Sequence, residues 1–277
     1  MSTRKSASDG PPSLPPGSVV SPGYEVREHL SRGRALDVYE VWSEERGCLC
    51  VVKTLRPDRS ADRSARRRLA TEGDLLLNLT HPHIVRAYEL VRRPSPALVL
   101  ETLSGATLAY MVKSRTRRLP VRELAVLGVQ LSSAVAYVHR HGYLHLDLKP
   151  SNVVCEDGLA KLIDLSIART PGRARKPVGT RPYMAPEQAR GGQLTEATDV
   201  WGLGGVLYES ATGRRPFKGA DEDGCPQLQR RAAGLRTWRR LPPEFGALVD
   251  ACLEPDPAGR PTIAELMAVL EPLATDA

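Results

Sequence analysis

The sequence contains no apolar run of about 18 residues, so it predicts no transmembrane helix. Its first residues, MSTRKSASDGPPSLPPGS, have no apolar core and are not expected to act as a secretory signal. Of its 5 cysteines only Cys48 and Cys50 lie close together, and no second pair stands nearby to complete a zinc site. Reduced thiols in strands or in the core are expected instead, and with them a cytoplasmic location.

The chain carries 39 Lys and Arg against 32 Asp and Glu, a net charge of +7. The basic residues form separate clusters at 63–68, 173–176 and 230–240. They accompany neither a pattern of stacking aromatic residues nor a nucleic-acid-binding motif, so no nucleic-acid partner is expected. The charge therefore indicates a solvated basic surface or contact with an acidic protein or substrate.

The periodicity of the chain divides it into a β-rich part and a helical part. Residues 1–23 are rich in Ser, Pro and Gly and are predicted to be a disordered tail. Short β-rich runs then surround one predicted helix at 62–79, and together they form a lobe over 24–103. A second lobe over 104–273 contains predicted helices at 121–142, 199–213 and 261–273, before a short tail at 274–277.

The stretch HLDLKPSN, residues 145–152, has the side chains that phosphoryl transfer requires. Asp147 can accept the proton of an acceptor hydroxyl, and Lys149 can contact the phosphate in transfer. Asn152 offers an uncharged oxygen to a metal ion, and Asp164 in KLIDLS supplies the second carboxylate that Mg²⁺ needs.

With these residues the chain resembles a eukaryotic-like, bacterial-type serine/threonine protein kinase from about Tyr24 to Leu273. The resemblance implies an α+β, two-lobed kinase fold, with a β-rich N-lobe that contains one main helix and a mostly helical C-lobe. It implies ATP and Mg²⁺ as cofactors, with Mn²⁺ as an alternative ion, and a protein substrate with a Ser or Thr acceptor. Lys53 in VVK resembles the lysine that binds the α- and β-phosphates, and Glu72 its helix partner.

The remaining site residues also follow from this resemblance. Around ATP they are Ser31, Gly33, Val38, Glu101, Leu103 and Val154, with the adenine against LETL at 100–103. The structural supports are Thr180 beside the Asp–Lys pair, Asp199 below the catalytic loop at 145–152, and Glu187 of the APE motif, which pairs with Arg260.

The chain departs from the family pattern in its glycine-rich loop and its Mg²⁺-binding motif. The loop reads Ser31-Arg-Gly-Arg-Ala-Leu-Asp-Val38, so that only the central glycine, Gly33, remains. A less flexible and weaker phosphate clamp is expected, because a Cβ impedes close approach of the backbone. Asp-Leu-Ser replaces Asp-Phe-Gly at 164–166, and its serine limits the backbone freedom of the segment.

Leu146 replaces the arginine that precedes the catalytic aspartate in much of the family, where it binds a phosphorylated loop residue. The loop of this chain has few hydroxyl groups and carries RARK at 173–176. Control without activation-loop phosphorylation is therefore expected, and the basic segment suggests an acidic partner.

We interpret the chain as an ATP- and Mg²⁺-dependent protein serine/threonine kinase with no attachment to a membrane. One alternative is a pseudokinase, a binding or scaffold module with weak or no catalysis, which the degenerate glycine-rich loop favours. A second alternative is a small-molecule phosphotransferase with a related core, although such enzymes generally lack the APE segment and its partners.

Overall fold

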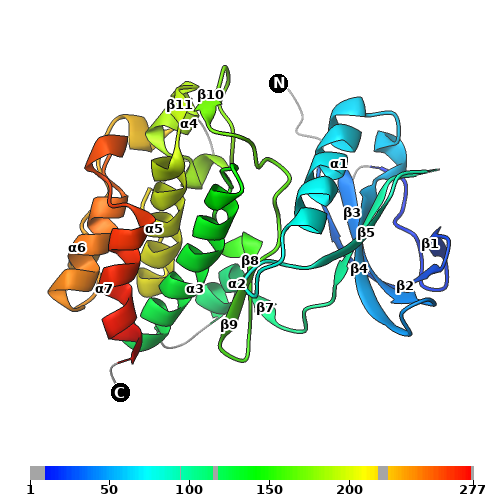
Figure 1. Cartoon of the computed structure of the whole chain (residues 1–277), viewed down its shortest axis with the longest axis horizontal. Helices are drawn as coiled ribbons and strands as arrows, with labels where there is room; N and C mark the ends of the chain where they lie inside the picture. The colour runs from blue at the N-terminus through cyan, green and yellow to red at the C-terminus, as the bar shows by residue number, and fades with distance from the viewer. Residues whose placement is uncertain (1–9, 94, 115–117, 218–223, 276–277) are drawn as a thin grey trace. The chain divides into compact units, whose positions relative to one another are not determined.

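The computed structural model describes residues 10–93, 95–114, 118–217 and 224–275 (Figure 1). The chain forms two compact units. The N-terminal unit runs through Thr80 and resumes from Val85 to Leu103, and the C-terminal unit contains His81–Ile84 and the chain from Ser104 onward. The predicted first lobe therefore includes four residues, 81–84, that belong to the C-terminal unit.

The N-terminal unit is an antiparallel sheet in the order β1-β2-β3-β4-β6-β5 with one long helix, α1 (Arg63–Asn78), packed on β4, β5 and β6. A short 3-10 helix, η1 (Pro57–Arg59), precedes α1. The strands are β1 (Val19–Ser21), β2 (Tyr24–Arg32), β3 (Leu36–Ser43), β4 (Cys48–Leu55), β5 (Ala87–Val91) and β6 (Ala97–Glu101). Asp62 caps α1, because its side chain accepts hydrogen bonds from the backbone of Ser64 and Ala65.

The prediction that residues 1–23 are disordered is wrong for the later part of this segment. Val19–Ser21 form β1, which pairs with β2, and Leu14 and Val20 pack against the core of the sheet. These apolar side chains hold residues 14–21 against the sheet. The polar composition of residues 1–23 as a whole gave no sign of this packing. Residues 1–9 lie outside the described part of the chain.

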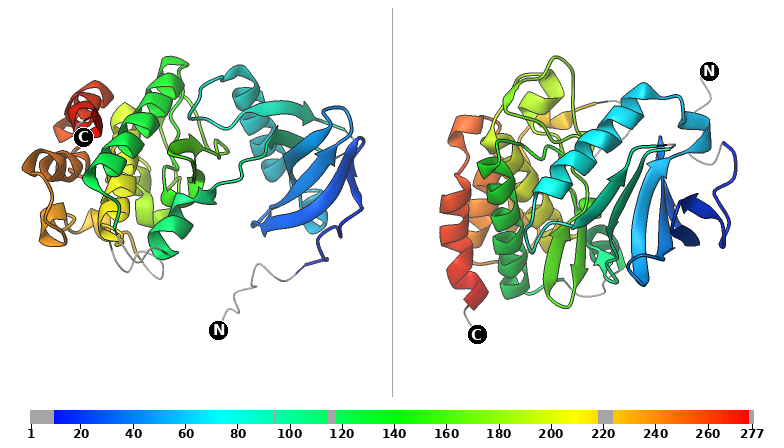
Figure 2. Two further views of the ribbon diagram at one scale, coloured as in Figure 1. Left: turned by 90° about the horizontal axis from the view of Figure 1, so that it is seen from below. Right: turned by 45° about the vertical axis from the view of Figure 1, so that its right-hand side comes forward.

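The C-terminal unit is mostly helical, and α3 packs against both α5 and α7 (Figures 1 and 2). The helices are α2 (Leu108–Ser114), α3 (Val121–Arg140), α4 (Pro186–Arg190), α5 (Glu196–Thr212), α6 (Pro243–Cys252) and α7 (Ile263–Thr275). Short 3-10 helices are η2 (Pro150–Asn152), η3 (Arg181–Tyr183), η4 (Pro226–Leu228), η5 (Leu235–Thr237) and η6 (Pro257–Gly259).

Two small sheets complete this unit. One contains β7 (Ala106–Thr107), β8 (Val153–Glu156) and β9 (Leu159–Leu162), and the other pairs β10 (Gly172–Arg173) with β11 (Gln193–Leu194). The hairpin of β8 and β9 starts directly after Asn152 and ends two residues before Asp164. It therefore brings the two predicted metal ligands to its open end.

The helix boundaries agree closely with the sequence pattern at two of the three predicted helices of this unit. Helix α3 ends at Arg140, just before Gly142 with a φ of 82°, and the capping box of Thr262 and Glu265 starts α7. Helix α5 begins three residues before its predicted start. The tail expected from residue 274 begins later, because α7 continues through Thr275.

Among the described residues, α3 is the helix whose length and composition would allow it to cross a membrane. Nine of its residues are buried, and it packs against α5 and α7. This burial is typical of the core helix of a globular domain.

Candidate functional site

Lys53 and Glu72 form a buried ion pair within the N-terminal unit. The ammonium of Lys53 on β4 lies 2.7 Å from Oε1 of Glu72 on α1, and the Glu72 side chain is fully buried. Helix α1 packs on β4, and this packing holds the two charges together. A cation fixed in this way can neutralise phosphate oxygens without rearrangement.

Three of the residues predicted around ATP share one face of the same sheet. Ser31 on β2 stands opposite Val38 on β3, and Val38 stands opposite Lys53 on β4. Because cross-strand partners point to the same side, these side chains form a row that leads to the ion pair.

The other residues predicted to bind ATP lie in different parts of the chain. Gly33 lies at the tip of the β2–β3 hairpin, where its N–H donates to the carbonyl of Leu36. Glu101 ends β6, and its carboxylate accepts a hydrogen bond from the N–H of Arg86. Leu103 is the last residue of the N-terminal unit, whereas Val154 lies on β8 of the C-terminal unit.

Asp147 is the centre of a hydrogen-bond network in the C-terminal unit. Thr180 donates to its Oδ1 through both the backbone N–H, at 3.0 Å, and the hydroxyl, at 2.6 Å. Lys149 donates to its Oδ2 at 2.6 Å and to the Thr180 hydroxyl at 2.7 Å. The side chains of Asp147 and Lys149 are 12% and 17% exposed, so both remain accessible to a substrate. The network presents an oriented carboxylate next to an ammonium.

Asn152 and Asp164 lie close to this network. The amide nitrogen of Asn152 donates to the carbonyl oxygen of Asp147 at 2.9 Å and to its Oδ2 at 3.2 Å, which turns the amide oxygen of Asn152 away. The carbonyl oxygen of Asn152 accepts from the N–H of Ile163, the residue before Asp164. Oδ1 of Asp164 accepts a hydrogen bond from the backbone of Ser166. Two side chains with oxygen atoms that could bind a metal ion thus stand near the carboxylate of Asp147.

Asp199 holds the catalytic loop from the start of α5. Its carboxylate accepts from the N–H groups of His145, at 2.8 Å, and Leu146, at 2.7 Å. These bonds fix Leu146 at a φ of 66°, a left-handed conformation that is unusual for a leucine. A second support is the buried bidentate pair of Arg260 with Glu187, at 2.8 and 2.9 Å.

His145, the first residue of the catalytic loop, is fully buried. Its Nδ1 accepts from the backbone N–H of Asp147 at 3.2 Å. Burial lowers the pKa of His145, although the carboxylates of Asp199, Asp147 and Asp164 act to raise it. All three carboxylates therefore lie near one imidazole whose burial disfavours its charged form.

Two further residues were not found by reasoning from the sequence. His139 on α3 contacts Oδ2 of Asp199 through Nε2 at 2.8 Å. Gln188 donates to the carbonyls of Leu146, at 2.8 Å, and Val178, at 2.9 Å, so it ties the catalytic loop to the segment before Thr180. His139 follows the buried Val138 on a predicted helix, which was a weak signal, whereas Gln188 lies in the five-residue α4, for which the sequence offered no signal.

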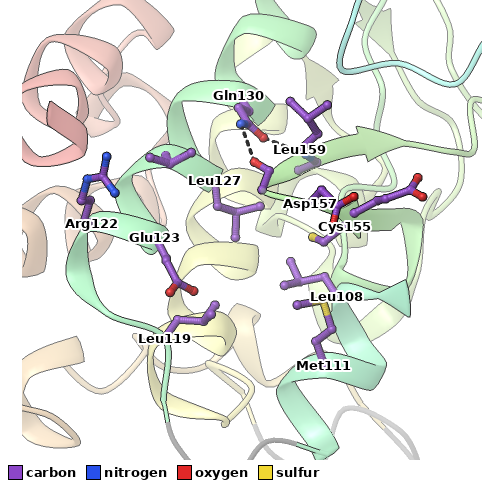
Figure 3. A pocket seen from close by; sticks show the side chains of 14 residues that line it. Leu108, Met111, Leu119, Arg122, Glu123, Leu127, Gln130, Cys155, Asp157 and Leu159 are labelled. Carbon is purple, nitrogen blue, oxygen red and sulfur yellow. Dashed lines mark hydrogen bonds between the residues drawn. The ribbon is translucent and has the colours of Figure 1, made fainter. Parts of the chain in front are cut away.

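A separate pocket of about 570 Å³ lies between α2, α3 and the β8–β9 hairpin (Figure 3). It is lined by apolar residues such as Leu108, Met111 and Leu127, with Glu123 and Asp157 among its polar residues. None of the predicted site residues lines it. Gln130 lies at its wall and donates to the carbonyl of Gly158, while it accepts from the N–H of Ala160.

The curated relatives that this chain matches include several bacterial serine/threonine-protein kinases. The chain is 34% identical over 209 residues to a probable serine/threonine-protein kinase of Streptomyces coelicolor, SCO3848, a match that covers 71% of this chain and 31% of the relative. It is 33% identical to the kinase PkaA of the same organism, covering 92% and 50%, and 31% identical to PknB of Mycolicibacterium smegmatis, covering 91% and 43%. The chain thus spans about a third to a half of these relatives.

A crystal structure of the PknI kinase domain of Mycobacterium tuberculosis, a double mutant, matches with a TM-score of 0.77 and 24% identity. The match covers 95% of this chain and 99% of that chain, and it confirms the predicted fold class. The protein kinase domain model matches residues 24–269, and with this match the chain is shown to belong to the protein kinase domain family.

Proposed function

We propose that the chain transfers the terminal phosphoryl group of ATP, with Mg²⁺, to Ser or Thr hydroxyls of protein substrates. The observation that carries this proposal is the network in which Lys149 and Thr180 hold both oxygens of Asp147. It provides a base for the hydroxyl proton and a positive charge beside the transferring phosphate, which are the two groups that the reaction needs at the acceptor.

The residues present fit a nucleotide-bound Mg²⁺ ion. In the described part of the chain no group of three or more His, Cys, Asp or Glu side chains could hold a metal ion by itself. Mg²⁺ typically takes one or two protein oxygens and completes its shell with phosphates and water. Asp164 and the amide oxygen of Asn152 would supply the protein ligands, and Lys53 would hold the α- and β-phosphates. Bound Mg²⁺ would neutralise charge on the phosphates.

The test is phosphate transfer from labelled ATP to a generic protein acceptor, with Mg²⁺ and the full chain. Asp147→Asn should abolish transfer, because the amide cannot accept the proton. The matched control is Asp157→Asn, since Asp157 is exposed on the β8–β9 turn at a φ of 46°, which Asn tolerates. Equal transfer by the wild type and Asp147→Asn would refute the proposal. The pseudokinase alternative requires that the wild type transfers little or no phosphate.

The proposal includes control without phosphorylation of the activation segment. Leu146 is buried in an apolar cluster with Leu144, Ala174 and Leu194, against which Ile167 and Val178 pack. Leu144 also exchanges backbone hydrogen bonds with Arg169 at 2.7 and 3.1 Å. Packing and backbone pairing thus act on this segment where other kinases use an arginine and a phosphate.

Phosphatase treatment should therefore leave the rate of substrate phosphorylation nearly unchanged. Thr170 is exposed, and Thr170→Ala should be close to neutral in the same assay. A loss of activity of about tenfold on dephosphorylation, reproduced by Thr170→Ala, would contradict this part of the proposal.

The basic residues of the segment support an acidic partner or substrate. Arg173, Arg175 and Lys176 are all exposed, whereas Ala174 between them is buried in the apolar cluster. Replacement of all three by Gln should change the preference among acidic and neutral acceptor peptides more than it changes the KM for ATP. A change in the KM for ATP alone would contradict the assignment.

A further inference from the structure

The tip of the β2–β3 hairpin is closed by a buried ion pair. Arg32 and Asp37 are register partners, and the guanidinium donates to both carboxylate oxygens, from Nε at 2.8 Å and from Nη2 at 3.0 Å. Asp37 has no exposed surface. His29 contacts its Oδ1 at 3.2 Å, and the Tyr39 hydroxyl donates to its Oδ2 at 3.4 Å. A buried carboxylate with this many partners holds its neighbours in one arrangement.

A second arginine fastens the same tip from β4. The backbone N–H of Arg56 donates to the carbonyl of Ala35 at 2.9 Å, and its Nη1 donates to the carbonyl of Gly33 at 3.2 Å. Asp58 orients this guanidinium through two hydrogen bonds, at 2.9 and 3.0 Å. Within the tip, the N–H of Gly33 donates to the carbonyl of Leu36 at 2.8 Å.

The chain before β1 covers the ion pair. Pro11 accepts a hydrogen bond from Nη1 of Arg32 at 2.8 Å, and the N–H of Leu14 donates to the Tyr39 hydroxyl at 3.1 Å. A Cβ added at Gly10 would displace the guanidinium of Arg56. We call residues 10–14 the covering segment.

The ion pair and the predicted nucleotide lie on opposite faces of the hairpin. Side chains alternate along a strand, so Asp37 and Tyr39 point away from the face that carries Val38 and Lys53. Arg32 and Asp37 therefore act on a nucleotide through the backbone of residues 33–36.

We infer that Arg32 and Asp37, with the covering segment, are positioning residues that preset the hairpin backbone for the phosphates of ATP. This inference rests on the proposed function. A loop with three glycines has more backbone freedom to lose when a nucleotide binds, whereas this loop is already fixed by charged contacts. Less conformational entropy is then lost on binding, which offsets the loss of two glycines.

The test compares Arg32→Gln, Asp37→Asn and the double variant in the full chain. The control is Glu25→Gln, which removes an exposed ion pair with Arg27 from the same strand. Calorimetry gives the Kd for Mg·ATP, steady-state kinetics give kcat and the KM for ATP, and thermal unfolding gives Tm. We expect each single variant to raise both Kd and KM about tenfold, with kcat at saturating ATP within about twofold. The double variant should be no weaker than the single ones.

A second perturbation keeps the test decisive if Asp37→Asn fails to fold. Gly10→Val leaves Arg32 and Asp37 intact but displaces Arg56, so it should raise the Kd for Mg·ATP and increase amide hydrogen exchange over residues 33–36. Unchanged Kd values in both Arg32→Gln and Gly10→Val would overturn the inference. A fall in kcat at constant KM would also overturn it, because it would show a role in folding only.

Failure of the proposed function can be distinguished from failure of the inference about the hairpin. A wild-type chain that binds Mg·ATP without transferring phosphate would refute the proposed function, while the Kd comparison would still decide the role of the hairpin. A wild-type chain that binds no Mg·ATP would overturn both.

Discussion

At the scale of single residues, the buried ion pair of Lys53 and Glu72 is expected to affect both catalysis and stability. The Glu72 carboxylate is fully buried 2.7 Å from the ammonium, so Lys53→Met removes the phosphate-binding cation and leaves a buried negative charge. We predict that kcat falls at least about 100-fold, and that the free energy of unfolding falls by about 3 kcal/mol. Phosphotransfer kinetics and urea denaturation measure the two effects. The exposed Lys113 on α2 provides the control Lys113→Met, which should change neither quantity.

Leu146 combines a strained backbone with a buried side chain, and two substitutions separate these features. Its φ is 66° and its side chain is buried in the apolar cluster. Leu146→Ala loses the packing and keeps the strain, so it should cost about 2–4 kcal/mol of stability. Leu146→Gly loses the packing but relieves the strain, so it should cost about 1 kcal/mol less than Leu146→Ala.

Urea denaturation of both Leu146 variants is the measurement. The matched control is Leu159→Ala, at a leucine that is 53% exposed, which should be nearly neutral. A glycine variant less stable than the alanine variant would show that the backbone at this position stores no strain.

At the scale of elements, the β8–β9 hairpin carries Asn152 and Asp164 at its open end, and Gln130 of α3 holds its turn. Figure 3 shows the two hydrogen bonds of this side chain, at 2.9 Å to Gly158 and 2.7 Å to Ala160. Gln130→Ala should lower the free energy of unfolding by about 1–3 kcal/mol, since two hydrogen bonds are lost. It should also raise the Mg²⁺ concentration needed for half-maximal activity, because the hairpin positions both proposed ligands.

The control for Gln130 is Arg122→Ala, at another α3 residue that lines the same pocket. Chemical denaturation and a Mg²⁺ titration of activity should leave this control unchanged. If Gln130→Ala loses stability but keeps the Mg²⁺ dependence of the wild type, the turn is not coupled to the metal ligands.

Long periodic helices were predictable from the sequence, whereas short helices were not. The spacing of leucines and valines predicted α3, and the end caps predicted the start of α7. Helices α2, α4 and α6 were not predicted, because seven, five and ten residues give too few turns for a clear period. The strand β1 was missed because its 3 residues lie in a segment of polar composition.

At the scale of the whole molecule, the half-buried His81 and the buried His145 contribute to a pH dependence of stability. Burial lowers the pKa of both His81 and His145, so the unfolded chain binds more protons than the folded chain below about pH 6.5. Their contribution to stability is therefore present above pH 6.5 and is lost as the pH falls toward the folded pKa values. Burial raises the pKa of Glu209, which acts in the opposite direction.

A comparison of slopes isolates one histidine from these other groups. His145→Asn keeps an acceptor for the N–H of Asp147 but cannot be protonated. We predict that Tm falls less steeply between pH 7.5 and 5.5 in this variant than in the wild type, by at most about 1.4 kcal/mol per pH unit in free energy. The exposed His141 provides the control His141→Asn. Parallel curves for wild type and His145→Asn would contradict the assignment.

The proposed site was predictable from the sequence because its residues follow one another in recognisable motifs. The contacts that support it were not, since they join residues far apart in the chain. His139 meets Asp199 across 60 positions, and Gln188 meets Leu146 across 42. The contacts of the covering segment were not predictable for the same reason, since Arg32 donates to the carbonyl of the distant Pro11. A sequence shows which side chains are polar, but not which of them the fold brings together.

Residues 81–84 leave the ribosome with the N-terminal unit but belong to the C-terminal unit. The carbonyl oxygen of His83 accepts from Leu162, its Nδ1 contacts the carbonyl of Ala160 at 2.9 Å, and Ile84 forms a parallel bridge with Leu162. Translation produces the N-terminal unit first, so these four residues are synthesised about 80 residues before β9, with which His83 and Ile84 pair. Two fragments divided at Leu103 would likewise separate His83 from β9. Fragments that keep each unit whole would need residues 81–84 on the C-terminal fragment.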